Sequence, residues 1–263
     1  MVAAGADEIA RGVWWLRGTR GSNVFALEAG DQLVLIDTGF ASSADAIGAE
    51  LERIAPGHAL DAILLTHAHV DHAGAAAALR ARYGCPVVAG AGDCRRDERG
   101  VSVLVEPLGR SHFVRRALGR LRSRAAVAEV VVDRPLSGGA LVAPGVLAIP
   151  TPGHTAGSYC YVDSARDIAF VGDLAISHGD GVLTRPLKMT NSDDATYLAT
   201  LAALAESAPA AGCAGHGPPV LGDFAACLRA LAALPRRSPF APRGALERAR
   251  RMRAFTRMLS RRR

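Results

Sequence analysis

Short apolar runs separated by glycine-containing turns occupy the first part of the chain. Runs of β-branched and aromatic residues between turn residues are typical of strands, and they predict strands at Val13–Leu16, Val24–Glu28 and Leu33–Asp37. A helix is expected from about Ser43 to Ile54, ending before Pro56, because proline interrupts a helix. The elements expected next are a strand at Ala62–Leu65, an alanine-rich helix at Ala73–Tyr83 and a strand at Pro86–Ala89.

A second series of apolar runs follows in the other half of the chain. Strands are predicted at 130–132, 141–142, 146–149, 159–162, 168–171 and 210–214. Helices are expected at 197–206 and at 224–234, after most of these strands. Strands therefore come in two sets, each followed by helices. This order predicts a layered α/β (α+β) protein with two sheets and helices outside them.

The expected domain organisation is one domain over residues 1–235 and a separate tail over residues 236–263. Residues of about 92–128 interrupt the strand pattern and are interpreted as a cap or insert, whose centre suits a basic amphipathic helix at 110–124. The tail is expected to be helical and basic, with a helix from about 245 to 259.

Composition excludes several classes of protein. The chain has 263 residues, of which 49% are hydrophobic and 21% charged, and this profile excludes a mainly disordered chain. Its 5 cysteines are widely spaced with no C-x-x-C, which argues against a disulfide framework and fits a reducing compartment. The N-terminus lacks the pattern of a secretory signal, and no uncharged apolar run is long enough for a membrane span. A cytoplasmic protein is therefore expected.

The formal net charge of +6 is concentrated at the C-terminus. Residues 236–263 hold many arginines and one acid, Glu247, whereas the remainder of the chain is net acidic. Such a tail could bind an anionic partner, either nucleic acid or an anionic membrane surface. The other interpretation is a solvated terminal helix without a partner.

Histidines and aspartates gather just after predicted strands. His67, His69, Asp71 and His72 directly follow the strand that ends at Leu65. Later turns add three more such residues, namely His154, Asp173 and His216. In extended backbone, residues two apart point the same way, so His67 and His69 can bind one metal ion together. Imidazole and carboxylate are suitable ligands for zinc, iron or manganese.

These segments resemble the motifs of the metallo-β-lactamase superfamily, and they occur in that family's order over roughly residues 10–220. The first motif is Thr66-His67-Ala68-His69-Val70-Asp71-His72-Ala73-Gly74. The further motifs are Thr151-Pro152-Gly153-His154-Thr155, Val171-Gly172-Asp173 and Gly215-His216-Gly217. Leu35-Ile36-Asp37-Thr38-Gly39 is similar to an early strand of the family, whose aspartate supports the site. The resemblance implies a four-layer αββα sandwich with a dinuclear metal site.

The resemblance also implies a ligand set. His67, His69 and His154 would bind the first metal, Asp71, His72 and His216 the second, and Asp173 would bridge both. Two divalent ions, zinc by preference and iron or manganese as alternatives, would activate a bridging hydroxide. Asp71 and Asp173 would be the catalytic residues, with Asp71 orienting the nucleophile or shuttling its proton. Asp37 and Thr66 would orient the imidazoles.

The expected function is hydrolysis of an ester, thioester or lactone bond of a small molecule. Within the family, the resemblance favours a generic glyoxalase II-like or lactonase-like hydrolase, because Asp173 and His69 are present and no convincing glutathione-binding motif of a true glyoxalase II follows His216. An alternative from another reaction class is a persulfide dioxygenase that uses a single iron held by His67, His154 and Asp173. The sequence predicts neither the substrate nor the oligomeric state.

Overall fold

The computed structural model describes residues 5–105 and 129–235. Most of the expected insert at 92–128, including the helix predicted at 110–124, lies outside the described residues. The tail at 236–263 also lies outside them, so its predicted helix and its binding of an anionic partner stay predictions. The domain boundary at residue 235 therefore stays a prediction.

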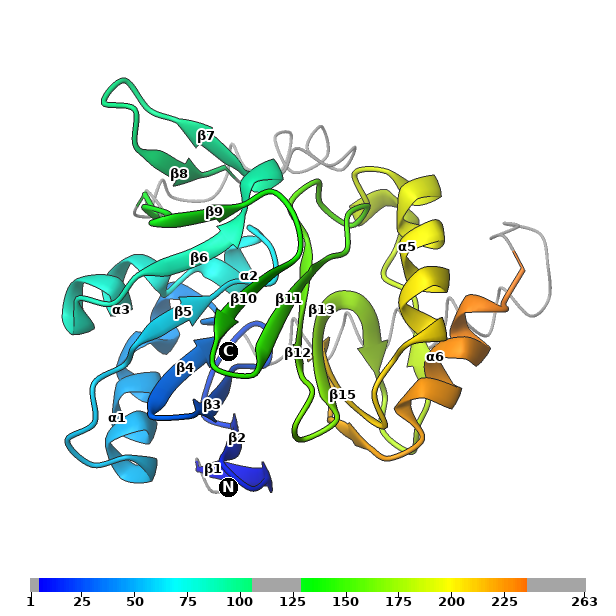
Figure 1. The fold of residues 1–263 in the computed structure, drawn as a ribbon, viewed down its shortest axis with the longest axis horizontal. Coiled ribbons are helices and arrows are strands. Elements are labelled where there is room, and N and C mark those ends of the chain that lie inside the picture. The colour runs from blue at the N-terminus through cyan, green and yellow to red at the C-terminus, as the bar shows by residue number, and fades with distance from the viewer. Residues whose placement is uncertain (1–4, 106–128, 236–263) are drawn as a thin grey trace, which may run out of the picture.

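The first sheet is built mainly from the N-terminal half of the chain and has the order β1-β2-β3-β4-β5-β6-β9 (Figure 1). The first four strands pair antiparallel, whereas β4, β5, β6 and β9 run parallel to one another. Its strands are β1 (Ala6–Ala10), β2 (Val13–Leu16), β3 (Phe25–Ala29), β4 (Gln32–Ile36), β5 (Ala62–Leu64), β6 (Val87–Gly90) and β9 (Arg134–Leu136). A separate hairpin of β7 (Cys94–Arg96) and β8 (Ser102–Leu104) projects beside this sheet.

The second sheet comes from the C-terminal half and has the order β10-β11-β12-β13-β15-β16, with β14 paired to β13. Most neighbours are antiparallel, but β13 and β15 run parallel. The strands are β10 (Ala140–Ala143), β11 (Val146–Pro150), β12 (Tyr159–Asp163), β13 (Ile168–Ser177), β14 (Leu183–Thr184), β15 (Ala211–His216) and β16 (Val220–Leu221).

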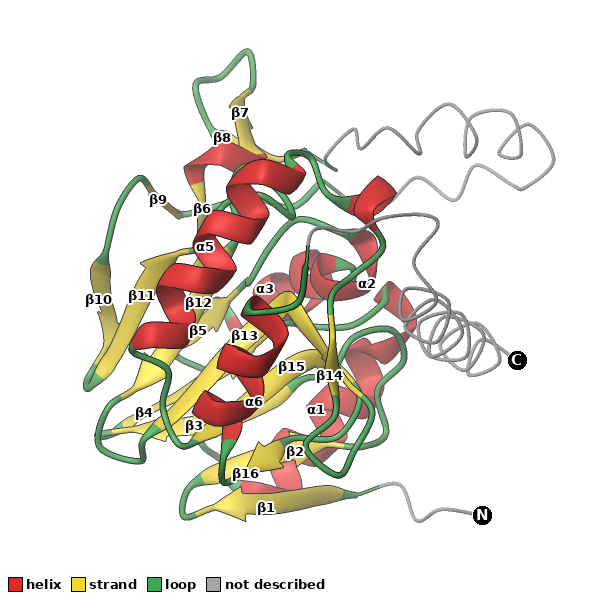
Figure 2. Cartoon of the chain, turned by 90° about the vertical axis from the view of Figure 1, so that its right-hand side faces the viewer, coloured by secondary structure: helices red, strands yellow, loops and turns green. Residues whose placement is uncertain are grey.

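Helices cover the outer face of each sheet. In the N-terminal half these are α1 (Ala44–Ile54), α2 (Val70–Ala73) and α3 (Ala76–Tyr83), and in the C-terminal half α5 (Asp194–Glu206) and α6 (Phe224–Ala232). Short 3-10 helices lie at Ala41–Ser43, Ala91–Asp93 and Lys188–Thr190. Figure 2 shows α5 and α6 lying side by side over the second sheet.

Side-chain alternation along the strands builds three apolar layers. On β4, Leu33 and Leu35 face α1 and α3, whereas Val34 and Ile36 face the other sheet. On β12, Tyr161 lies between the sheets and Cys160 faces α5 and α6. Because both faces of both sheets are covered, the strands read as nearly continuous apolar runs. The predicted αββα sandwich is confirmed.

Local chemistry explains where the helices begin and end. Asp193 caps α5 by accepting hydrogen bonds from the amides of Ala195 and Thr196, at 2.9 and 3.2 Å. Gly84 ends α3 in the left-handed conformation, with φ +68°. The helix predicted at 73–83 is present as α3, which begins at Ala76, and the residues before it form the separate short helix α2.

Several strands differ from the sequence-based expectation. Residues 130–132 form no strand but one isolated bridge, Val103 to Val131. Strand β13 continues to Ser177, six residues beyond the predicted end at Val171, so Asp173 lies within a strand and not in a turn after it. Gly172, with φ +50°, sits at a register irregularity against β15 and lets the strand continue through this position. Within the described ranges, no helix has the length and apolar character that a membrane span requires.

Candidate metal centre

The seven residues expected from the sequence come together between the two sheets, at one end of the strands. His67 and His69 lie in the loop after β5, and Asp71 and His72 lie on the short helix α2. His154 follows β11 in a turn, Asp173 lies on β13, and His216 is the last residue of β15. The sheet order therefore joins side chains that are far apart in sequence.

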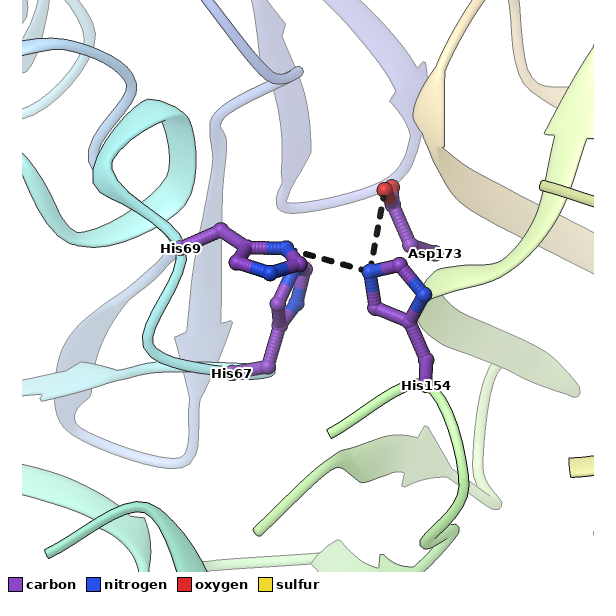
Figure 3. A group of neighbouring side chains, drawn as sticks. All are labelled: His67, His69, His154 and Asp173. Atoms are coloured by element: carbon purple, nitrogen blue, oxygen red, sulfur yellow. Dashed lines mark hydrogen bonds and ion pairs between the residues drawn. The ribbon is translucent and has the colours of Figure 1, made fainter. Parts of the chain in front are cut away.

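The first group consists of His67, His69, His154 and Asp173 (Figure 3). His69 Nδ1 lies 2.9 Å from His67 Nε2 and 3.1 Å from His154 Nε2. Asp173 Oδ2 lies 3.5 Å from His154 Nε2. Four potential ligand atoms thus converge from one loop of the first sheet and two segments of the second.

The second group consists of Asp71, His72 and His216. His216 Nε2 lies 3.6 Å from Asp71 Oδ2 and 3.4 Å from Asp173 Oδ1. The same Asp173 oxygen lies 3.3 Å from His72 Nε2. One oxygen of Asp173 therefore faces each group, which is the placement that a bridging ligand needs.

The donor set fits divalent metal ions. Nε2 of His72 and Oδ1 of Asp173 are buried and have no hydrogen-bond partner. Leaving such polar atoms unpaired costs about 1–3 kcal/mol each, and a cation between them would satisfy both. Zinc bonds of about 2.0–2.1 Å in a tetrahedral site place ligand atoms a little over 3 Å apart, close to the separations observed here. That all seven residues bind metal stays a prediction.

Burial and mutual repulsion keep part of the first group uncharged. Burial lowers the pKa of His67 well below its ordinary value, and the neighbouring imidazoles lower it further. Burial likewise lowers the pKa of His69 to about 3. A histidine must be neutral to donate its lone pair to a metal. These two side chains therefore have the protonation state that a ligand requires.

The carboxylate of Asp173 is held in its charged form. Burial raises its pKa, but His216, His72 and His154 together lower it well below the ordinary value of an aspartate. Burial lowers the pKa of His72, but Asp37 and Asp173 more than offset this and raise it well above its usual value. Negative charge at the centre of five imidazoles is what makes the pocket attractive to cations.

Asp37 and Thr66 fix the orientation of the imidazoles, as the sequence suggested. Asp37 follows β4 in a left-handed conformation with φ +57°. Its carboxylate accepts hydrogen bonds from the amide and hydroxyl of Thr66, both at 2.8 Å. Because Nδ1 of His72 lies 2.8 Å from Asp37 Oδ2, that nitrogen donates and Nε2 is left free to face the centre.

Three further residues that hold the site were not found from the sequence. Asn191 accepts a hydrogen bond from Nδ1 of His154 at 2.9 Å. Asn23 donates to the carbonyls of Ala214 and Gly217, at 2.9 and 2.6 Å, and so holds the turn around His216. Asp93 connects the loop of His67 to that of His154. None lies in a recognisable motif, because each acts through contacts with residues far away in the chain.

Glycines leave the space that the centre occupies. A β-carbon on Gly215 would come within 2.5 Å of Asp173 Oδ1 and 2.7 Å of His72 Cε1. One on Gly172 would lie 2.6 Å from the hydroxyl of Thr66. Only glycine therefore fits at these two strand positions, which accounts for the Gly172-Asp173 and Gly215-His216 pairs of the sequence.

The cysteines near the motifs do not take part. Cys160 and Cys213 are buried among apolar side chains, and burial raises the pKa of Cys160 to about 12. All five thiols of the chain are free. A buried, protonated thiol is a poor metal ligand, so histidine and aspartate carry the site.

Comparison with known proteins finds a matching family model and two curated relatives. The sequence model described as "Metallo-beta-lactamase superfamily" matches residues 17–216. The uncharacterized protein YobT of Bacillus subtilis (strain 168) is 27% identical over 214 residues, which are 74% of this chain and 82% of that protein. The hydroxyacylglutathione hydrolase of Bradyrhizobium sp. (strain ORS 278) is 32% identical over 152 residues, which are 55% of this chain and 46% of the relative.

Solved structures show the same fold. A metallo-beta-lactamase with a HARLDQ motif from Cronobacter sakazakii is 22% identical, with a TM-score of 0.57 over 98% of this chain and 96% of that one. FIM-1 from Pseudomonas aeruginosa, in a mono-zinc form, is 21% identical with a TM-score of 0.60, covering 88% and 95% of the two chains. TTHA1623, in a di-iron-bound form, is 26% identical with a TM-score of 0.54, covering 84% and 95%.

Proposed function

Since this chain belongs to the metallo-beta-lactamase superfamily, we propose that it is a metal-dependent hydrolase that cleaves an ester, thioester or lactone bond of a small molecule. The observation that carries this proposal is the position of Asp173, whose two oxygens face the two ligand groups at 3.3–3.5 Å. A hydrolase needs a polarised carbonyl and an activated water side by side, and two adjacent ions provide both.

We assign one ion to His67, His69 and His154, a second to Asp71, His72 and His216, and the bridging role to Asp173. Ions bound there would bring the pKa of a bound water towards neutrality and polarise the substrate carbonyl. Zinc suits these nitrogen and oxygen ligands. The di-iron form of TTHA1623 supports iron as the alternative metal.

The protein's own groups supply orientation and proton transfer. Asp37 and Asn191 hold His72 and His154 through their Nδ1 atoms, so that Nε2 of each points to the centre. Asp71 lies at the edge of the second group, with an 18% exposed side chain, 3.6 Å from His216. A partly exposed carboxylate beside the centre can orient the attacking water and take up its proton. We therefore assign these tasks to Asp71.

The type of bond is proposed from the relatives and from the site. The relative from Bradyrhizobium is named as a hydroxyacylglutathione hydrolase, which supports carbon–sulfur ester cleavage. That match spans 46% of the relative, so glutathione itself does not carry over to this chain. Esters, thioesters and lactones all present one carbonyl and one leaving atom, and this centre could serve each of them.

Metal analysis and a hydrolysis panel on the full chain test the proposal. Two zinc ions per chain with turnover of an ester, thioester or lactone would support it, whereas one iron per chain with persulfide oxidation would favour the dioxygenase alternative. His67→Ala and Asp173→Ala should each lose metal and activity. His58→Ala is a matched control, because His58 is exposed in the turn after α1. Full turnover by His67→Ala would overturn the assignment.

A further inference from the structure

We propose that Asp93 is a positioning residue, which holds the loop of His67 and His69 against the turn of His154. Asp93 ends the short 3-10 helix Ala91–Asp93 after β6 and is 4% exposed. It touches none of the seven ligand side chains in the hydrogen bonds of the described residues. This inference rests on the proposed metal centre, and it adds a residue that determines the geometry of the first ligand group.

The contacts of Asp93 connect the two halves of the molecule. Its Oδ2 accepts hydrogen bonds from the amide of Ala68 at 3.0 Å and from the hydroxyl of Thr155 at 2.7 Å. Its Oδ1 accepts from the amide of Gly157 at 2.8 Å. Ala68 lies between two of the proposed ligands, and Thr155 directly follows the third. One carboxylate therefore fixes the spacing of three ligands that come from two sheets.

Backbone packing brings the two segments close enough for this connection. A β-carbon on Gly90 would lie 2.1 Å from the carbonyl oxygen of Gly157, and one on Gly92 would lie 2.5 Å from that of Ala156. A β-carbon on Gly157 would lie 2.5 Å from the amide nitrogen of Asp93. The main chain of residues 90–93 thus packs directly against that of residues 156–157. This packing places the carboxylate of Asp93, in addition to its hydrogen bonds.

The chemistry of the contacts requires an acceptor on both oxygens. All three partners are donors, so an ionised carboxylate can satisfy them all. An asparagine of the same shape offers one acceptor and turns an NH₂ group towards a donor on the other side. Hydrogen bonds to a charged group are also the stronger ones. Asp93→Asn therefore breaks the connection on one side with little change in volume.

A second buried aspartate provides a control for an ordinary loss of stability. Asp163 is 2% exposed and accepts hydrogen bonds from the amides of Ala165 and Arg166, at 3.0 and 3.2 Å. It is the last residue of β12, and its side chain bonds to residues 165 and 166, away from the loops of the proposed ligands. Asp163→Asn should therefore lower the melting temperature of the metal-free protein without changing its affinity for zinc.

The test is a competition titration of the metal-free full chain with zinc and a chromophoric chelator, followed by the visible spectrum of the cobalt form. Loss of a group that orients metal ligands typically weakens binding about 10- to 100-fold, and we expect this for Asp93→Asn. The cobalt spectrum should change as well, because the ligands of the first group shift. Unchanged affinity and spectrum, or an equal loss in Asp163→Asn, would overturn the proposal.

Thr155 keeps the inference testable if Asp93→Asn does not fold. Thr155→Val removes the hydroxyl that donates to Asp93, whereas Thr155→Ser retains it. Weaker zinc binding by the valine variant, with recovery in the serine variant, would support the role of Asp93, and equal binding by the two would overturn it. If the unsubstituted chain binds no zinc or cobalt, the proposed metal centre itself fails, and that result is distinct from all the others.

Discussion

Nδ1 of His72 lies 2.8 Å from Oδ2 of Asp37, and both side chains are buried. The same carboxylate also accepts hydrogen bonds from the amide and hydroxyl of Thr66, so a single side chain connects the end of β4 to the start of the segment 66–72, which carries four proposed ligands. Orientation of an imidazole by a carboxylate is a general way to strengthen a metal ligand. This pair leads to the first prediction.

Asp37→Asn should weaken zinc binding about 10- to 100-fold while the chain remains folded. Asparagine tolerates the left-handed backbone at this position, but it has one acceptor where three donors converge. A zinc competition titration measures the effect. Asp61→Asn is the matched control. Asp61 accepts a hydrogen bond from the amide of Leu33 at 2.7 Å, at the end of the same sheet that lies away from the centre. Equal affinities in the two variants would contradict the prediction.

Gly215→Ala should reduce the metal content of the protein. The added methyl group would lie 2.5 Å from Asp173 Oδ1 and 2.7 Å from His72, so the bridging oxygen must shift. Elemental analysis of the purified variant measures the outcome. Gly138→Ala serves as the control, because a β-carbon there has no atom within 4 Å. A fully loaded Gly215→Ala protein would show that this part of β15 can shift without affecting the ligands.

Asn191→Ala should lower the affinity for zinc by removing the acceptor for Nδ1 of His154. Asn191 is itself held by a 2.8 Å hydrogen bond from its side-chain nitrogen to Asp194 Oδ1, so it is a rigid support. The zinc titration is compared with that of Thr190→Val, a change one residue away whose hydroxyl bonds only to the carbonyl of Leu187 among the described contacts. Identical titration curves would remove Asn191 from the site.

Asp133→Asn should destabilise the protein at neutral pH but not in strong acid. Hydrogen bonds from Arg80, at 2.7 and 2.9 Å, lower the pKa of Asp133 below its ordinary value. When the pKa of a carboxyl is lower in the folded state than in the unfolded state, it stabilises the protein at pH values above the unfolded-state pKa. This stabilisation is lost as the pH falls through the folded-state pKa. Because the pair is partly exposed, we expect a loss of about 1 kcal/mol or less.

Denaturant unfolding of the Asp133→Asn variant and of the unsubstituted protein, at neutral and at acidic pH, measures this difference. The gap between their free energies of unfolding should close towards acid. A gap that stays constant with pH would mean that the hydrogen bond to the amide of Val87, at 2.9 Å, carries the effect and the charge does not.

Most strands and the layered arrangement of two sheets could be predicted because apolar runs are separated by turns that contain glycine, and the resemblance to the family supplied the αββα order. β4, β5 and β6 are buried on both faces and appear in the sequence as short apolar runs. Strands β1, β9 and β16 were missed, since β1 and β9 carry charged residues and β16 has only two residues. Sequence alone has no signal for such pairing.

The residues of the candidate site could be proposed from the sequence because they stand in compact motifs after apolar strands. Asp93 and Asn191 could not, since their role depends on contacts with residues far away in the chain. Asp93 bonds to Gly157, which is 64 positions away, and Asn191 to His154, which is 37 positions away. A lone aspartate in a turn reads as a solvated loop residue until the fold shows what it faces.

The main-chain contact between residues 90–92 and 156–157 has a consequence for engineering. A library that seeks new substrates must leave Gly90, Gly92 and Gly157 unchanged, because any side chain there would push the sheets apart. The projecting hairpin of β7 and β8 begins one residue after Asp93 and tolerates sequence change far better. Diversity is therefore best placed from Arg95 onward, at exposed positions that leave the contact between residues 90–92 and 156–157 unchanged.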